Sequence, residues 1–492
     1  MARLYISNFR FQIADFRFQI CLHKYNPSRK FFGTDFLYFY SMKKIILIAV
    51  LLFVNLKSFS QCTNFVAVGF NHTIALRTDG TLWGWGFNTS GQTGTGNQDV
   101  VITTPGQIGT DNNWATVAAG VNFSVAIKND GTLWYWGSSR YGTSGSGITS
   151  EYLPVQIGTD TNWKTVNAGN SHCVALKMDG SLWSWGTNRY GQLGDGSNTN
   201  RWLPEQVGTA TDWETITTGD WHTLSIKTDG SLWATGFNIR GELGNGTTTD
   251  SNTFLQVGTD TDWKSIAAGN AHTAALKNDN TLWVWGNNYS GQLGNDTTID
   301  IHVPTQLNTS AWQFITCGYG STMGITTNGA LYGWGYNEYG QIGDGSRQDR
   351  HIPVRIGTAN NWKFLASADH TVALQDDNSL YGWGLNGDGE LGNGNQLWIN
   401  SPALLLSCEE IALNEDFNTD IFSIYPNPSS SILNIISKDH SFIEKVTIYD
   451  IYGKEIATWG SNVIDISIFS QGTYVVEITT NGITQNLKFV KI

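Results

Sequence analysis

From residue 62 to residue 408, apolar side chains alternate with polar or small ones, which places them on one face of an extended chain. In one such run Trp183 and Trp185 stand two residues apart and therefore share a face. An Asp-Gly pair, as at Asp179-Gly180, precedes the run and favours a tight hairpin turn that needs positive φ. No stretch here keeps a helical period. The pattern predicts short antiparallel strands joined by hairpins.

This strand pattern repeats at a period of about fifty residues. One copy contains Pro-x-Gln-Ile-Gly, a strand that begins with Trp, a Gly-x-x-His turn, Leu-Trp-x-Trp-Gly and Gly-Gln-Leu-Gly-Asp-Gly, and residues 154–196 follow it closely. Because small sheets copied in this way close into a ring, we predict an all-β chain whose main part is a seven-bladed β-propeller. The aromatic anchors of the seven copies are Trp83, Trp134, Trp183, Trp233, Trp283, Tyr332 and Tyr381.

These units resemble the repeats of the regulator of chromosome condensation family, whose members form seven-bladed propellers. The resemblance covers residues 62–408, and seven variants of one phrase carry it. The copies depart from the phrase at Thr235, which replaces the second Trp, at Tyr332 and Tyr381, which replace the first, and at Ser367, where we expect a Gly. We expect these departures to change local packing and to leave the architecture intact.

The two ends of the repeat region predict how the ring closes. The first copy begins at Thr63 without its Pro-x-Gln-Ile strand, and a further copy of that strand follows the last repeat at residues 402–406. We therefore expect one blade to be built from both ends of the region. Aligned on the second repeat, Cys62 and Cys408 fall two positions apart, within reach of a disulfide bond, which we predict. We expect Cys173 and Cys317 to be buried free thiols.

Composition and charge limit the partners. The chain has 492 residues, with 29 Lys and Arg against 41 Asp and Glu. Without residues 1–60 the counts become 20 and 39, because that segment holds nine basic and two acidic residues. The mature net charge of −19 that follows argues against nucleic acid or an anionic membrane as a partner, because phosphate binding needs clustered cations.

The amino-terminal region reads as an export signal. Residues 42–60 combine a short basic start, an apolar run and small residues before Gln61, which is typical of a secretory signal peptide. Such a segment is too short for a stable membrane span, so we expect no span in the mature chain. Residues 1–41 fit no part of a signal, and we expect translation to begin at Met42, which makes them a spurious extension.

The carboxy-terminal region loses the period after residue 408. Residues 409–420 form an acidic and polar linker, and residues 421–492 contain short alternating runs that predict a small β-sandwich. This segment resembles the type A carboxy-terminal sorting domain of the type IX secretion system of Bacteroidetes. The resemblance rests on the Tyr-Pro-Asn-Pro opening at residues 425–428, on Gly-Thr-Tyr-Val at 472–475 and on Lys-Phe-Val-Lys at 488–491. It implies transit through the periplasm, the type IX machinery as a partner, and a secreted or surface location; a carbohydrate-binding module is the alternative.

The repeated polar residues favour structural roles. Histidine recurs in the Gly-x-x-His turn at His72, His172, His222, His272 and His370, and could bind a metal or, more simply, hydrogen-bond a neighbouring backbone. The glycine-rich phrase lacks the Lys-Ser/Thr of a phosphate-binding loop. Loop carboxylates such as Asp195, Asp250, Asp296, Asp344 and Asp349 lack the spacing of a calcium loop. We expect no metal and no cofactor.

No catalytic motif stands out, because no acid, base or nucleophile breaks the repeat. We predict a secreted or cell-surface recognition protein, not an enzyme, that binds an extracellular protein or glycan through the variable loops between each Trp-Gly and the next Pro. The family includes exchange factors for a nuclear GTPase, an activity that we do not expect of an exported protein. The alternative is a secreted polysaccharide-degrading enzyme. The candidate ligand-binding residues, of types enriched at interfaces, are Arg140, Tyr141, Arg189, Tyr190, Trp202, Arg240, Tyr289, Tyr336, Tyr339 and Trp398.

Overall fold

The computed structural model describes the repeat region and most of the carboxy-terminal region. The residues described are 12–13, 16–17, 62–139, 142–145, 150–307, 310–407, 422–425, 427, 429–437, 443–450, 454–480 and 483–491. The predicted signal peptide and the predicted linker lie outside them. Within the described ranges, every element is a β-strand, starting with the short pair β1 (Gln12–Ile13) and β2 (Phe16–Arg17). None of these residues belongs to a helix with the length and apolarity needed to cross a bilayer.

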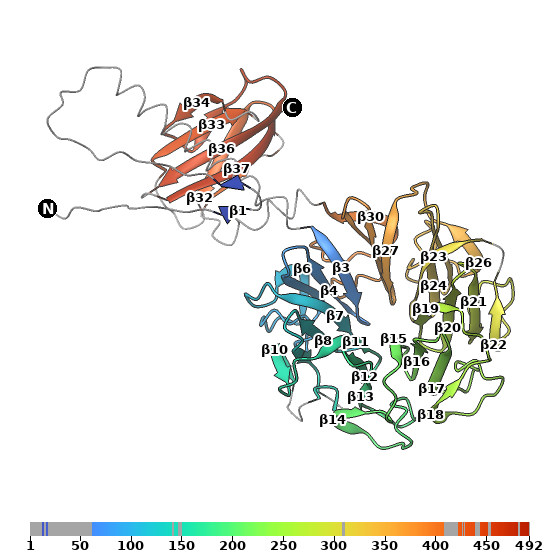
Figure 1. The fold of residues 1–492 in the computed structure, drawn as a ribbon. Helices are drawn as coiled ribbons and strands as arrows, with labels where there is room; N and C mark the ends of the chain where they lie inside the picture. Colours follow the sequence, from blue (N-terminus) through green and yellow to red (C-terminus); the bar gives the residue numbers. More distant parts are fainter. Residues whose placement is uncertain are drawn as a thin grey trace, which may run out of the picture. The chain divides into compact units, whose positions relative to one another are not determined.

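Seven four-stranded antiparallel sheets surround a central axis, one for each copy of the repeat (Figure 1). We number them as blades 1 to 7 in chain order, and give the strands of each from the innermost outward. Blades 1 to 3 are β3 (Thr63–Val68), β4 (His72–Arg77), β5 (Leu82–Phe87) and β6 (Val101–Gln107); β7 (Trp114–Ala119), β8 (Phe123–Lys128), β9 (Leu133–Gly137) and β10 (Glu151–Ile157); β11 (Trp163–Ala168), β12 (His172–Lys177), β13 (Leu182–Gly186) and β14 (Arg201–Gln206).

Blades 4 to 7 have the same order. They are β15 (Trp213–Thr218), β16 (His222–Lys227), β17 (Leu232–Gly236) and β18 (Ser251–Gln256); β19 (Trp263–Ala268), β20 (His272–Lys277), β21 (Leu282–Gly286) and β22 (Ile301–Gln306); β23 (Trp312–Cys317), β24 (Ser321–Thr326), β25 (Leu331–Gly335) and β26 (Arg350–Arg355); β27 (Trp362–Ser367), β28 (His370–Gln375), β29 (Leu380–Gly384) and β30 (Ile399–Leu406). The predicted all-β propeller fold is confirmed.

The expectation of one blade built from both ends of the repeat region is wrong. Each Pro-x-Gln-Ile segment is the outermost strand of the preceding sheet, as β6 is in blade 1 and β30 is in blade 7. Every blade is therefore one continuous stretch of chain, and the ring closes by packing. Val66 and Trp85 of blade 1 share a core cluster with Val372 and Leu374 of blade 7, and Leu405 packs against it.

The alternation read from the sequence accounts for the layers of each blade. The second strand is buried along its whole length, since blades cover both of its faces. In the third strand Trp185 is fully buried, while Trp183 is half-buried and covers the Lys177 side chain. The hairpin before this strand requires positive φ, which Gly180 adopts at 79° and Asn280 at 66° in the corresponding place. Asp-Gly and Asp-Asn are thus equivalent here.

A polar latch joins neighbouring blades. At the joint of blades 1 and 2, the Gln92 carbonyl accepts hydrogen bonds from Trp136 Nε1 and Ser124 Oγ. Because the Ser124 hydroxyl donates to that carbonyl, it accepts the proton of His72 Nε2, 2.9 Å away. The same histidine–hydroxyl bond links His172 to Thr223, His222 to Thr273 and His272 to Thr322. We predicted that each histidine forms a hydrogen bond with a neighbouring backbone group. This prediction is wrong in the partner, because the partner is a side-chain hydroxyl.

The joint of blades 2 and 3 replaces the polar latch with apolar groups. Phe123 takes the place of histidine, and Cys173 takes the place of the hydroxyl residue; both are buried in one core cluster. Burial raises the pKa of Cys173. Cys173 and Cys317 are free and buried, as predicted.

The carboxy-terminal region folds into two sheets with one core. The first sheet has the order β31 (Phe422–Tyr425), β32 (Ile432–Ser437), β35 (Val463–Asp465). The second has the order β34 (Glu455–Trp459), β33 (Lys445–Asp450), β36 (Gly472–Thr480), β37 (Ile483–Lys491). Leu433 and Ile435 of the first sheet share a buried cluster with Val446 and Val476 of the second. The predicted small β-sandwich is confirmed.

Candidate functional site: the loop face of the propeller

Seven backbone hydrogen bonds define one face of the ring. In each blade the residue that follows the third strand, or ends it in blade 1, donates to a carbonyl in the turn between the first two strands, as Thr187 does to Ser171. The long variable loops and these inner turns therefore lie on the same side, which we call the loop face. The Asp-Gly hairpins lie at the other ends of the strands, on the opposite side.

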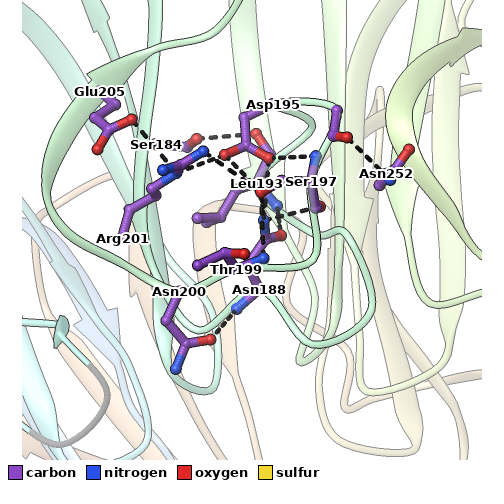
Figure 2. A network of polar contacts seen from close by, with 11 residues as sticks. Ser184, Asn188, Leu193, Asp195, Ser197, Thr199, Asn200, Arg201, Glu205 and Asn252 are labelled. Carbon is purple, nitrogen blue, oxygen red and sulfur yellow. Dashed lines mark hydrogen bonds and ion pairs between the residues drawn. The ribbon is translucent and has the colours of Figure 1, made fainter.

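Asparagine side chains fix the loops of this face. In blade 3, Asn188 Oδ1 accepts the backbone N–H of Leu193, and Asn188 Nδ2 donates to Ser197 (Figure 2). Asp195 accepts the backbone N–H of Ser197 and pairs with Arg201 Nε at 2.7 Å. Asn238, Asn288, Asn337 and Asn386 repeat the asparagine contacts in later blades. The loops are thus ordered platforms.

The loop carboxylates help to hold the same loops in place. Asp344 pairs with Arg350 at 2.6 Å, and Asp250 and Asp349 accept backbone N–H groups of Asn238 and Asn337. Asp296 adopts a positive φ of 62° in its turn. In the ranges that the structure describes, no three His, Cys, Asp or Glu side chains gather as a metal site would require.

A central channel of about 450 Å³ opens on the loop face. Its wall consists of the innermost strands, β3, β7, β11, β15, β19, β23 and β27, and of the residues that follow them. Asp220 is the charged residue among those lining it. The rim that we call the channel mouth is formed by the residue after the turn glycine in blades 1 to 6: Phe70, Val121, Asn170, Asp220, Asn270 and Tyr319.

Blade 7 interrupts this rim because its inner turn is one residue shorter. Ser367 pairs with Thr371 as Cys317 pairs with Thr322, so Ser367 ends β27, and Ala368 takes the glycine position. The assignment of Ser367 to the glycine position is therefore wrong. With no rim residue from blade 7, Phe70 and Tyr319 from blades 1 and 6 meet edge to face at 5.8 Å.

The inner turns carry two carboxylates, Asp220 in the channel mouth and Asp369 in the turn of blade 7. Asp220 Oδ2 accepts a 2.5 Å hydrogen bond from Asn270 Nδ2, and Asn170 donates to the same carboxylate from the other side. Burial raises the pKa of Asp220. Asp369 follows Ala368 in blade 7; it is 5% exposed, and its Oδ1 has no hydrogen-bond partner. Burial and the charge of Asp220 raise the pKa of Asp369 to about 6.

Two further buried carboxylates occupy positions where other blades have glutamine. Gln192 Oε1 accepts the backbone N–H of Tyr190, and Glu242 and Glu390 accept the corresponding N–H groups. Both Glu side chains are fully buried, each with an Oε1 that lacks a partner. Burial is the main cause that raises the pKa of each to about 7.

Three of the predicted ligand residues come together on the loop face. Tyr336 packs edge to face on Tyr339, at a centroid distance of 5.9 Å, and Tyr339 packs on Trp398 at 5.1 Å. The exposed guanidinium of Arg347 lies 5.0 Å from the Trp398 ring. Trp398 is 39% exposed. These four residues of blades 6 and 7 form what we call the aromatic cluster.

The other predicted residues do not join this cluster. Tyr190 packs against Phe237, at 4.8 Å, with Arg189 over its ring. Arg240 pairs with Asp300. Trp202 and Tyr289 are 55% and 84% exposed, in separate blades. Arg140, Tyr141 and Cys408 lie outside the described residues, so the Cys62–Cys408 bond stays a prediction.

Asp220, Asp369 and Tyr319 were not among the residues predicted from the sequence. A signal existed, since the position after the turn glycine holds a different kind of side chain in almost every copy, whereas the glycine before it repeats. The shorter turn of blade 7 could not be recognised from the sequence. A deletion in a turn becomes visible only when the pairing of the strands fixes the alignment of one blade with the others.

Six stretches match the family described as regulator of chromosome condensation (RCC1) repeat: residues 79–127, 130–176, 179–226, 229–276, 279–325 and 328–374. Together they span more than half of the chain. The chain belongs to the RCC1 repeat family. A second RCC1 repeat description matches six stretches that overlap these, from 65–92 to 366–390. Residues 423–492 match the secretion system C-terminal sorting domain, in accordance with the predicted resemblance.

Relatives of this RCC1-repeat protein include a Protein RCC2 homolog from Xenopus laevis, 35% identical over 88 residues, which are 18% of this chain and 17% of the relative. The ultraviolet-B receptor UVR8 of Arabidopsis thaliana is 34% identical over 89 residues, 18% of this chain and 20% of the receptor. The match thus spans a fifth or less of each relative's length.

Solved structures share the propeller fold. Human WBSCR16 covers 66% of this chain and 94% of its own at 20% identity, with a TM-score of 0.61. Prp20p of Saccharomyces cerevisiae, a structure described with its binding to Gsp1p and histones, covers 64% of this chain and 83% of its own at 23% identity, with a TM-score of 0.57. At these identities the likeness concerns the fold alone.

Proposed function

We propose that this exported RCC1-repeat protein is a recognition protein, which binds an extracellular protein or glycan through the loop face of its propeller. The sorting domain supports the exported state, since it indicates delivery by type IX secretion to the cell surface or beyond. The predicted signal peptide would supply the first step, transit to the periplasm.

The observation that carries this proposal is the aromatic cluster of Tyr336, Tyr339, Trp398 and Arg347. Aromatic rings and arginine contribute much of the binding energy at protein interfaces, because they offer large apolar area together with hydrogen-bonding ends. Edge-to-face packing of the rings reduces the side-chain entropy that a ligand would otherwise remove on binding. The asparagine-fixed loops hold the cluster in one arrangement in the same way.

A nucleotide-exchange role is not part of the proposal. Gsp1p is a partner of Prp20p, a relative in fold alone, and the acidic balance of this chain gives no reason to extend histone binding to it. We propose instead that the variable loops select their own extracellular partner.

Glycan arrays and pull-downs from the native medium test the proposal on the full exported chain. We expect Trp398→Ala and Tyr339→Ala to lower binding at least tenfold, because they remove the exposed ring and its support. Met178→Ala is the matched control, since Met178 is an exposed apolar residue on the opposite face. Equal loss in the control, or full binding by both aromatic variants, would refute the loop-face assignment.

The polysaccharide-degrading enzyme remains the alternative function. Its test is turnover of surface polysaccharides by the exported chain, with reducing ends or unsaturated products as the readout. Turnover that persists without any stable complex would replace the recognition proposal.

A further inference from the structure

The joint of blades 3 and 4 lacks an indole ring that every other joint contains. Each of these rings donates its Nε1 hydrogen to a backbone carbonyl in a loop of the preceding blade, as Trp285 does to Glu242. Blade 4 has Thr235 at this position, and its hydroxyl donates to the Gly191 carbonyl instead. The tryptophans of the other six blades are fully buried: Trp85, Trp136, Trp185, Trp285, Trp334 and Trp383.

A second departure from the repeat lies beside the first. Six blades carry a proline in their outermost strand, whereas β18 of blade 4 carries Phe254 at this position. Phe254 belongs to the bulge of β18 that lies opposite Thr235 of β17. The two changes are therefore neighbours in one sheet. The prolines of the other blades are Pro105, Pro154, Pro204, Pro304, Pro353 and Pro402.

The phenyl ring of Phe254 takes only part of the place of the missing indole. It packs on Trp213 at a centroid distance of 5.1 Å, and a side chain at Gly194 would clash with it. In blade 5 the corresponding tryptophans have a centroid distance of 6.2 Å, and a side chain at the corresponding loop glycine would likewise clash with the indole. A phenyl ring is smaller than the two fused rings of an indole, and this one enters from the outermost strand instead of the third. The space is therefore filled incompletely.

A pocket of about 330 Å³ lies at this joint, and its size is at the lower end of the range of small-molecule sites. Three aromatic rings line it, those of Phe254, Trp213 and Trp233. Val207 and Ala210, from the connection between blades 3 and 4, add apolar surface. Because aromatic rings attract one another in edge-to-face and offset-stacked arrangements, such walls favour a planar aromatic ligand.

The pocket offers a ligand no unpaired charge. Asp195 is the one charged residue among those that line the pocket, and it pairs with Arg201 at 2.7 Å. Lys227, whose Nζ lies within 4.8 Å of the ring centroids of both tryptophans, pairs with Asp212 at 3.1 Å. An ionised ligand would lose hydration here without gaining a counter-ion. The surroundings therefore favour an uncharged ligand.

We propose that the joint of blades 3 and 4 binds one uncharged, planar aromatic ring of indole size in the pocket between Phe254, Trp213 and Trp233. The other six blades supply the chemical model, since each buries an indole at the corresponding joint. The ring belongs to a tryptophan side chain of a protein partner or to a free small molecule. The site shares no residue with the aromatic cluster of blades 6 and 7, so it does not depend on the proposed function.

Titration calorimetry on the full exported chain tests this site with three uncharged probes. They are indole, Nα-acetyl-tryptophanamide and, as the apolar compound without a planar ring, Nα-acetyl-leucinamide. We expect the first two to bind and the leucine compound to bind at least tenfold more weakly. Tighter binding of indole assigns a free small molecule, and equal or tighter binding of the tryptophan compound assigns a side chain of a protein partner. Equal affinity for the leucine compound, or no binding of either aromatic probe at about 5 mM, would overturn the proposal.

Substitutions locate the binding. The double variant Thr235→Trp with Phe254→Pro restores the residues of the other six blades, so it should close the pocket and weaken binding of the aromatic probes at least tenfold. Near-ultraviolet circular dichroism and an unchanged or higher melting temperature would show that this variant is folded. If it does not fold, Ala210→Leu, which fills the pocket from the connection between the blades, decides in its place.

The control removes an exposed aromatic ring elsewhere. Trp398→Ala, in the aromatic cluster, should change binding of the aromatic probes less than twofold. Unchanged affinity in a folded pocket-closing variant would refute the site. Equal loss in Trp398→Ala would also refute it, because the probes would then bind at the aromatic cluster.

Discussion

His370 Nε2 lies 2.8 Å from Thr73 Oγ1, although the two residues are 297 positions apart in the chain. Thr73 Oγ1 in turn donates to the Glu390 carbonyl, and Trp85 Nε1 donates to the same oxygen. This is the latch found between consecutive blades, now formed between blade 7 and blade 1. The joint that closes the ring is thus chemically like the joints that carry a histidine and a hydroxyl, and it needs no strand exchange.

The hydrogen bond between His172 and Thr223 predicts that a second substitution can recover the stability lost by a first one. His172→Phe should cost about 1–3 kcal/mol in unfolding free energy, because the Thr223 hydroxyl loses its donor in a dry interface. Adding Thr223→Cys should recover at least half of this loss in unfolding free energy, since blades 2 and 3 already combine Phe123 with Cys173. Denaturant unfolding of the four chains of the cycle measures the coupling. His351→Phe, an exposed position, is the control, and strictly additive losses would contradict the prediction.

The same histidines predict acid sensitivity. Burial lowers the pKa of His72, His172, His222 and His370 to about 3, and that of His272 to about 4. Between these values and 6.5 the unfolded chain binds more protons than the folded one, so stability falls as the pH falls. Each histidine contributes up to about 1.4 kcal/mol per pH unit, and the raised carboxyl pKa values offset part of this. The melting temperature should therefore decrease as the pH is lowered from 7.5 to 4.5. A constant melting temperature over this range would contradict the prediction.

Glu242 predicts a stabilising substitution with the opposite pH dependence. Because burial raises its pKa to about 7, the folded chain binds the proton more tightly than the unfolded chain, and the stability it contributes is lost as the pH rises through 7. Glu242→Gln should therefore stabilise by about 2–3 kcal/mol at pH 8.5 and by little at pH 5. Gln192 shows that the amide fits the position. Glu214→Gln, at an exposed carboxylate, should change nothing at either pH.

On the face opposite the loops, lysine side chains lie between tryptophan rings. We expect their positive charge to stabilise the fold. Lys177 Nζ lies 3.6 Å from the Trp183 ring centroid and 2.7 Å from Asp160 Oδ2. Lys177→Met should cost about 1–2 kcal/mol, because it removes a desolvated cation–π contact while keeping the volume. Lys177→Arg should cost less, since Arg77 occupies the equivalent place over Trp83 at 3.5 Å. Thermal unfolding of both variants measures the difference, and equal losses would contradict the role of the charge.

The predicted Cys62–Cys408 bond sets the expected number of free thiols. Cys62, the residue before β3, is buried, and Leu406, two residues before Cys408, packs against the cluster that joins blades 7 and 1. A chain beginning at Gln61 contains Cys62, Cys173, Cys317 and Cys408. Denatured without reductant, it should expose two reactive thiols, those of Cys173 and Cys317. Four would contradict the bond. Reduction should lower stability by up to about 5 kcal/mol, because the closed loop is long.

The repeat, the strands and the propeller could all be predicted from the amino-acid sequence. Period-two alternation and turn residues such as Asp179-Gly180 act locally, so they can be read without knowledge of distant contacts. The same local logic identified the sandwich at the carboxyl end and the burial of Cys173 and Cys317. It could not decide which sheet takes the Pro-x-Gln-Ile strand, because either neighbour offers an edge, and the prediction of a split blade failed there.

The contacts near the axis of the ring depend on how the blades pack in three dimensions. Phe70 and Tyr319, from blades 1 and 6, meet because the turn of the intervening blade 7 is one residue shorter. The partner of each histidine is likewise a hydroxyl on the next blade. Such contacts depend on how the curved sheets pack around a common axis, which sets distances between residues hundreds of positions apart. Local sequence patterns do not encode those distances.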